Sequence, residues 1–171
     1  MNFTNYKEFL NDKNPHVLID MGDLGTMELE LFPEVAPITV KNFLKLIDDK
    51  FYDGIIFHRV IEGFMIQGGD PDGIGTGGSK ENIKGEFISN GVNNLLAHSR
   101  GVISMARTMV PDSASSQFFI MHKDAPHLDG NYAAFGVVLK GIEVVDKIAS
   151  VRTDYYDKPL KDVVIKTIKR I

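Results

Sequence analysis

Hydrophobic and polar positions alternate along most of this chain, a pattern that predicts short β-strands rather than long helices. Residues 26–32 alternate Met27, Leu29 and Leu31 with two glutamates, so they predict a strand with one side in solvent. Further short apolar runs, separated by Gly-rich or polar turns, predict strands at 55–61, 64–67, 102–106, 117–121, 133–139 and 163–168. Many short strands in one compact chain favour an antiparallel sandwich or a closed barrel.

Two segments repeat their apolar positions at helical spacing instead. They predict amphipathic helices at 37–49, where Pro37 suits the first turn, and at 141–150. Residues 1–15 form a short polar lead-in, with one helical turn expected around Tyr6, Phe9 and Leu10. No internal repeat or linker interrupts the rest, so residues 16–171 are expected to form one domain.

The stretch FHRVIEGFMIQGGD at residues 57–70 predicts a strand, a tight turn and a second strand. The alternation places Arg59 opposite His58, and it places Met65 and Gln67 together, with Phe64 on the other face. A cation and an amide beside apolar groups suggest a site for a mostly apolar ligand with one carbonyl. The alternative is a surface arginine and a hydrogen-bonded amide without function. His58 is expected to be a hydrogen-bonded core histidine.

Composition narrows the possible functions. The chain has 171 residues, 43% of them hydrophobic and 25% charged, as in soluble proteins with one sizeable core. A net charge of −4 without a run of Lys or Arg predicts neither nucleic acid nor an anionic membrane as partner. The absence of cysteine excludes disulfides and thiolate metal sites. A polar start and no membrane-length apolar run predict a cytoplasmic protein.

The Gly-rich stretch at residues 68–78 resembles two ligand-binding loops without fulfilling either pattern. A phosphate loop needs Gly-Lys-Ser/Thr before a helix, whereas Gly78 is followed by Ser-Lys and no helical pattern. An EF-hand frame starting at Asp70 leaves Ile74 and Gly78 at two of its ligand positions, where neither supplies a side-chain oxygen. We therefore expect a turn that lets the backbone approach a ligand.

Metal and nucleophile chemistry also lack support. His122 and His127 lie near two aspartates, but Pro126 breaks any helical spacing between them, so no metal is expected. Serines occur at 104, 113, 115 and 116, yet none lies in the G-x-S-x-G turn of an activated nucleophile. Acyl transfer is therefore not expected.

Several motifs in order resemble the cyclophilin family of peptidyl-prolyl cis–trans isomerases, in its bacterial branch. After FHRVIEGFMIQGGD come GTGG at 75–78, SMAR at 104–107, SQFFI at 116–120 and LDGNYAAFG at 128–136. The resemblance runs from about residue 16 to the C-terminus. It implies a mainly β fold, a closed eight-stranded antiparallel β-barrel capped by two α-helices, in agreement with the strand pattern.

The resemblance also implies a site without metal or cofactor. Its catalytic residues would be Arg59, Phe64, Gln67, Phe119 and Tyr132. Its substrate-binding residues would be Met65, Gly75, Ala106, Arg107, Thr108, Gln117, His127 and Leu128. Four apolar residues would form the floor for the proline ring: Phe64, Met65, Phe119 and Leu128. Arg107 would pair with the peptide mainly through its backbone, and the residues that rim a neighbouring pocket would be Gly75, Ala106, Thr108 and Gln117.

The implied chemistry suits these residue types. An X–Pro bond isomerises over tens to hundreds of seconds because amide resonance sets a barrier of about 18–20 kcal/mol. In the twisted transition state the imide nitrogen regains its lone pair, and the Arg59 guanidinium could donate a hydrogen bond to it. Gln67 would orient Arg59 or hold the carbonyl. No bond is broken, so no nucleophile is needed.

This sequence departs from the family pattern at several positions. His127 stands where cyclosporin-sensitive members carry tryptophan, and Tyr132 where many carry histidine, so cyclosporin is expected to bind weakly. The loop at residues 106–117 is one residue longer than the common eukaryotic form. Arg107 adds a charge at the mouth of the second pocket, which favours acidic residues near the proline.

The expected partners are proline-containing peptides and unfolded or folded client proteins, bound by a monomer that assists protein folding. An alternative is a proline-segment binding module or holdase that does not depend on turnover. A third hypothesis is a metal- or anion-binding barrel.

Overall fold

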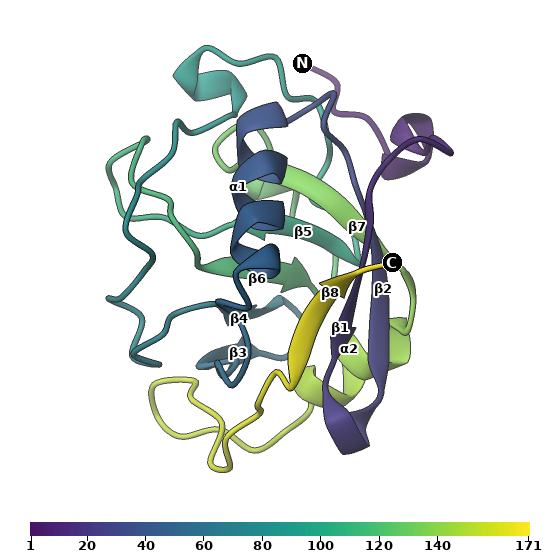
Figure 1. Cartoon of the computed structure of the whole chain (residues 1–171). Helices are drawn as coiled ribbons and strands as arrows, with labels where there is room; N and C mark the ends of the chain where they lie inside the picture. Colours follow the sequence, from purple (N-terminus) through teal and green to yellow (C-terminus); the bar gives the residue numbers. More distant parts are fainter.

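The computed structural model describes all residues from 1 to 171, and its main feature is an eight-stranded antiparallel sheet (Figure 1). Along the sheet the strands follow the order β3-β4-β6-β5-β7-β2-β1-β8. Their bounds are β1 (His16–Asp20), β2 (Thr26–Leu31), β3 (Arg59–Ile61), β4 (Met65–Gly68), β5 (Val102–Met105), β6 (Phe118–Met121), β7 (Ala134–Lys140) and β8 (Thr167–Arg170). The predicted mainly β fold with eight antiparallel strands is confirmed.

The strands β3 and β8 lie at the two ends of this order. Ile56 and Val164, which precede these two strands, form a single antiparallel bridge. Beside it, the Phe57 N–H donates to the Val163 carbonyl at 2.9 Å. The strands predicted at 55–61 and 163–168 are therefore shorter and shifted, because their first halves make only this bridge.

The two predicted helices are confirmed as α1 (Pro37–Asp48) and α2 (Ile142–Ala149). Helix α1 begins at Pro37, as predicted, and Figure 1 shows it crossing in front of β5 and β6. Its Phe43 packs edge-on against Phe118 of β6 at 5.6 Å and Phe135 of β7 at 5.1 Å. Helix α2 lies against β2, β3 and β4. Neither helix combines the length and apolar character that crossing a bilayer requires.

The start of α1 is stabilised from a distant part of the chain. Ala36 precedes the helix and has no side-chain group to accept a hydrogen bond from it. The buried Glu86 carboxylate instead accepts from the Ile38 N–H at 3.2 Å and the Thr39 N–H at 2.6 Å. A negative charge at a helix N-terminus is favourable. Glu86 therefore ties the loop that precedes β5 to α1.

Strand β1 was absent from the predicted elements. Val17 and Ile19 are fully buried and alternate with half-exposed neighbours, and β1 pairs with both β2 and β8. The pattern was present but short, because His16 and Asp20 leave only three apolar residues between them.

The polar lead-in of residues 1–15 packs on the sheet domain. The expected helical turn is a 3-10 turn at Tyr6–Phe9, and the Phe9 ring lies 5.9 Å from Phe32. Thr4 forms a parallel bridge with Leu96. The Glu30 carboxylate holds the end of the segment by accepting from the Asn11 N–H and the Asn14 amide, both at 2.9 Å.

Candidate active site

The pairing of the strands brings the central predicted residues into one row. Arg59 of β3 lies opposite Gln67 of β4, Gln67 lies opposite Phe119 of β6, and Phe119 lies opposite Ser104 of β5. Directly opposed residues of antiparallel strands point to the same side of the sheet. These four side chains therefore form one row across β3, β4, β6 and β5, on the same side of the sheet.

A hollow of about 170 Å³ lies over this row. Six of its nine lining residues are hydrophobic, and Arg59 supplies a cation at its edge. The lining residues are Arg59, Phe64, Met65, Gln67, Ala106, Arg107, Phe119, Leu128 and Tyr132. The structure thus brings together nine of the predicted site residues, taken from five separate stretches of the chain.

Phe64 reaches this hollow although simple alternation placed it on the face opposite Met65. Phe64 is not part of β4, which begins at Met65, and its N–H closes a turn onto the Ile61 carbonyl at 3.0 Å. The turn rotates the Phe64 side chain out of the strand's alternation. The predicted face was therefore wrong for Phe64, whereas Met65 and Gln67 lie together as predicted.

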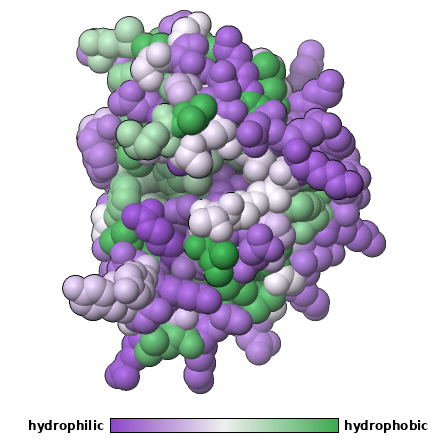
Figure 2. Space-filling view, turned by 90° about the vertical axis from the view of Figure 1, so that its left-hand side faces the viewer, coloured by the Kyte–Doolittle hydropathy of each residue, from purple (hydrophilic) through white to green (hydrophobic).

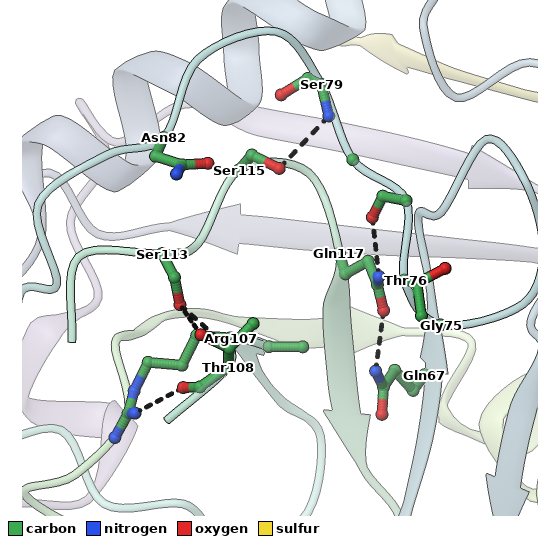
Figure 3. Close-up of a pocket in the computed structure, with 13 residues that line it drawn as sticks. Gln67, Gly75, Thr76, Ser79, Asn82, Arg107, Thr108, Ser113, Ser115 and Gln117 are labelled. Carbon is green, nitrogen blue, oxygen red and sulfur yellow. Dashed lines mark hydrogen bonds between the residues drawn. The ribbon is translucent and has the colours of Figure 1, made fainter. Parts of the chain in front are cut away.

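Arg59 is positioned by a relay of side-chain amides. Its Nη1 donates to Gln67 Oε1 at 3.1 Å. Gln67 Nε2 in turn donates to Gln117 Oε1 at 3.0 Å (Figure 3). Gln117 Nε2 then donates to the Gly77 carbonyl at 2.8 Å. Each amide gives one hydrogen bond and receives one, which determines its orientation. The remaining guanidinium donors of Arg59 stay free for a ligand.

A second, larger hollow of about 500 Å³, the polar hollow, adjoins the first, and all but one of its 13 lining residues are polar residues or glycines. The expected rim residues Gly75, Ala106, Thr108 and Gln117 all line it (Figure 3). Ser113 and Ser115 also line it and were not predicted as site residues. Ser113 accepts from the Thr108 N–H at 2.9 Å, so it shapes the longer loop that carries Thr108.

The Arg107 side chain does not stand free at the mouth of this hollow, as the sequence suggested. Its guanidinium is stacked between Phe87 and Tyr132, at 4.7 and 4.6 Å from the ring centres. It also donates to the Thr108 and Asn131 carbonyls. The backbone N–H and carbonyl of Arg107 make no hydrogen bond within the chain. Its backbone is therefore available to pair with a peptide, while its side chain is already bound.

Comparisons with known proteins decide what this arrangement belongs to. The family model "Cyclophilin type peptidyl-prolyl cis-trans isomerase/CLD" matches residues 16–170. The chain is 50% identical over 139 residues to a peptidyl-prolyl cis–trans isomerase of Acinetobacter baylyi, covering 78% of this chain and 72% of that protein. Peptidyl-prolyl cis–trans isomerase A of Dickeya dadantii is 42% identical over 172 positions, covering 95% of this chain and 88% of that protein.

The chain belongs to the cyclophilin family. Its activity is peptidyl-prolyl cis–trans isomerisation, as the motifs predicted. A crystal structure of a cyclophilin-type isomerase from Cryptosporidium parvum matches with a TM-score of 0.84 at 34% identity, covering 92% of this chain and 98% of that one. A second structure of that protein, in the presence of the dipeptide Ala-Pro, matches with a TM-score of 0.83 at 35% identity, covering 91% and 98% of the two chains.

Beneath the floor of the site, this cyclophilin contains a buried Ser–His–Asp arrangement. His98 Nε2 lies 2.8 Å from Ser104 Oγ, and Nδ1 lies 3.0 Å from Asp129 Oδ1. Ser104 is fully buried, so a substrate cannot reach its hydroxyl for nucleophilic attack. The His98 ring stacks on Phe119 at 6.0 Å and 18°. The hydrogen-bonded Ser104, His98 and Asp129 therefore support Phe119 from below. The local sequence gave no signal for this arrangement, because Asp129 lies 31 residues after His98.

The residues of the MHKDAPHLDG segment serve separate purposes in the cyclophilin. His122 Nδ1 accepts from the Gly63 N–H at 2.9 Å, and Nε2 lies 3.0 Å from Asp146. His127 is exposed, with its ring 5.6 Å from Phe64, beside the apolar hollow rather than in its lining. The predicted contribution of His127 is thus limited to the outer edge.

The Gly-rich loop is organised by the Asp70 side chain. The buried carboxylate accepts from four backbone N–H groups, those of Asp72, Ile74, Gly75 and Gly77, at 2.6 to 3.1 Å. A Cβ at Gly77 would clash with Asp70 Oδ1, so only glycine fits there. Burial favours a higher pKa for Asp70, but the four hydrogen bonds outweigh it and lower the pKa.

This lowered pKa predicts a pH-dependent contribution to stability. Asp70 stabilises the fold fully above its unfolded pKa, ordinarily 3.8, and the contribution is lost as pH falls through the lower folded pKa. The Asp70→Asn variant should be about 2 kcal/mol less stable than the wild type near neutral pH. That gap should shrink as pH falls from about 5 to about 3 in denaturant unfolding. A stability difference between the two proteins that stays constant over this pH range would contradict the lowered pKa of Asp70.

His58 differs from the expectation of a hydrogen-bonded core histidine. It is buried, at 6% exposure, but neither ring nitrogen has a hydrogen-bond partner. Burial lowers its pKa, Asp70 opposes this, and Arg59 and Lys158 add to the lowering. The expected burial is confirmed and the expected hydrogen bond is wrong.

Proposed function

We propose that this cyclophilin catalyses rotation about X–Pro bonds in client proteins by stabilising the twisted imide without covalent chemistry. The observation that carries the proposal is the Arg59 guanidinium at the edge of an apolar hollow. It makes one hydrogen bond, to Gln67, and its other donors are free. The proline ring would lie on Phe64, Met65, Phe119 and Leu128. The Arg59 guanidinium would then donate to the imide nitrogen as the bond twists and its lone pair returns.

The energies suffice for this mechanism. A 10⁴-fold acceleration requires roughly 5.5 kcal/mol. A charge-assisted hydrogen bond supplies about 1.5–3 kcal/mol. Transfer of the imide from water into the apolar hollow favours the less polar twisted form, and shape complementarity to that form supplies the remainder.

Other parts of the site would hold the client segment. The free backbone groups of Arg107 would pair with the peptide, and the polar hollow around Gln117 would receive a neighbouring side chain. Tyr132 would form the outer wall of the apolar hollow, where its ring is held by Arg107. With His127 outside that hollow, cyclosporin is expected to bind only weakly.

Several broader predictions accompany this function. We propose that the protein assists protein folding as a monomer in the cytoplasm, and that residues 1–15 are a lead-in to an isomerase domain at 16–171. We also propose that the sheet is a closed barrel, on the strength of the Ile56–Val164 bridge between its ends. Sedimentation of the purified protein would test the monomer.

The function is tested by cis–trans exchange of a peptide that contains Ala-Pro. A sub-stoichiometric amount of the protein should shorten the cis–trans exchange time from tens of seconds to below about one second, because rotation about the X–Pro bond is the only slow step in the free peptide. Exchange spectroscopy by NMR measures both directions without a coupled protease. An exchange time equal to that of the free peptide would overturn the proposed function.

A further inference from the structure

A third hollow, of about 440 Å³, shares Gln67 and Gly75 with the polar hollow. It is bounded by the turn at residues 73–75 and by the loop that contains Asp154, Tyr156 and Lys158. Arg59 also lines the apolar hollow, and Gln67 lines all three hollows. A client segment held at the active site would therefore pass directly beside this third hollow.

The charge at this hollow is positive although the protein is acidic overall. Arg59 and Lys158 both line it, and neither forms an ion pair, whereas Arg100 and Arg170 each pair with an aspartate. The one carboxylate in its lining is Asp154, whose Oδ1 accepts from the Tyr156 and Lys158 N–H groups at 2.8 and 3.0 Å. Asp154 thus shapes its own loop, and two cations face the hollow.

An unpartnered polar side chain lies at the bottom of the hollow. His58 is 6% exposed and both of its ring nitrogens lack a hydrogen-bond partner. A buried polar group without a partner is costly and calls for an explanation. A Cβ at position 75 would lie 3.6 Å from His58 Nε2, so the turn at Gly75 packs directly over the buried ring.

The rim of the hollow offers apolar surface. Ile74 and Tyr156 line it and are 67% and 82% exposed, and Tyr156 lies edge-on against Tyr155 at 5.7 Å. The surface on the side of the long loops is otherwise mostly hydrophilic, with hydrophobic residues in small separate groups (Figure 2). Exposed apolar groups beside a charged hollow are typical of a binding surface.

We propose that this third hollow is a side-chain pocket for an aspartate or glutamate in the client segment that carries the proline. The carboxylate would face the Lys158 ammonium above the buried His58 ring, while its methylene groups would contact Ile74 and Tyr156. Arg59 adds a favourable field without leaving its place over the imide. The proposal rests on the isomerase site described above, because that site positions the segment.

The test compares paired peptides that contain Ala-Pro and differ only by glutamate or glutamine, placed in turn at three positions on each side of the Ala-Pro pair. NMR exchange measures kcat/KM for each pair. At one position the wild-type protein should favour glutamate by about fivefold, as expected for a half-exposed ion pair, and added salt should reduce the preference. In Lys158→Ala the ratio at that position should fall to about one.

Lys161→Ala is the matched control, since Lys161 is an exposed cation of the same loop outside the hollow. It should keep the full preference for glutamate. A ratio near one at every position of the wild type, a preference that survives in Lys158→Ala, or an equal loss in Lys161→Ala would each overturn the pocket. Acceleration of the glutamine peptides separates this failure from failure of the isomerase function, in which no peptide would exchange faster.

Discussion

Replacing Arg59 with alanine is expected to lower kcat/KM for an Ala-Pro peptide by about 100-fold. The variant removes the donor proposed for the imide nitrogen, and a charge-assisted hydrogen bond of about 1.5–3 kcal/mol corresponds to roughly 10- to 150-fold. The Arg59→Lys variant keeps the charge but loses the planar fork that bonds Gln67 and would bond the imide at the same time. It should recover only a small part of the lost activity. NMR exchange of one peptide with all three proteins makes the comparison.

The same variant distinguishes an enzyme from a binding module. Arg59 is exposed and its one hydrogen bond is to Gln67, so alanine should change the free energy of unfolding by less than about 0.5 kcal/mol. Peptide affinity should fall far less than turnover, because the apolar floor is untouched. If Arg59→Ala turned over the peptide within threefold of the wild type, Arg59 would not be the central catalytic group. If the cellular role of the protein survived the loss of turnover in Arg59→Ala, that result would support the holdase alternative.

The second large effect is expected from Asp129, which lies below the site rather than in it. Asp129→Ala should lower the free energy of unfolding by about 3 kcal/mol, measured by denaturant titration. The carboxylate accepts from the His98 backbone N–H at 2.6 Å and from His98 Nδ1 at 3.0 Å. Both donors are buried, and alanine would leave both without a partner. The His98 ring would lose the contact that holds it against Phe119.

Asp129→Asn is the appropriate comparison, because both hydrogen bonds reach Oδ1, and an amide oxygen in that place can still accept them. It should be more stable than Asp129→Ala by about 1 kcal/mol or more. Activity should fall in both variants in the same order, since Leu128 directly precedes Asp129 and Phe119 stacks on His98. An alanine variant within about 0.5 kcal/mol of the wild type would show that the buried arrangement contributes little to the fold.

Local pattern and family motifs predicted different parts of this molecule. Alternation identified β2 and the two helices because each buries one face, and that periodicity is visible within a few residues. It missed β1, where only three apolar residues lie together, and it misplaced Phe64, which belongs to a turn. The motifs, in contrast, named all nine residues of the apolar hollow.

The remaining features depend on partners far apart in the chain. His98 and Asp129 are 31 residues apart, and Glu86 caps a helix 47 residues before it. No window of local sequence contains such pairs, so their roles become visible only when the sheet brings them together. The Arg107 side chain shows the same limit, because its charge was evident but its stacking on Phe87 and Tyr132 was not.

The cross-strand row of Arg59, Gln67 and Phe119 makes the activity a strict reporter of correct strand pairing. Sliding β4 by one residue would turn Gln67 toward the interior and bring Ile66, now fully buried, to the surface. A molecule with that misalignment could retain most of its strand content and still lack the relay from Arg59 to Gln117. In refolding, regain of catalysis would therefore distinguish molecules with the native alignment from compact ones with neighbouring alignments, which circular dichroism would count together.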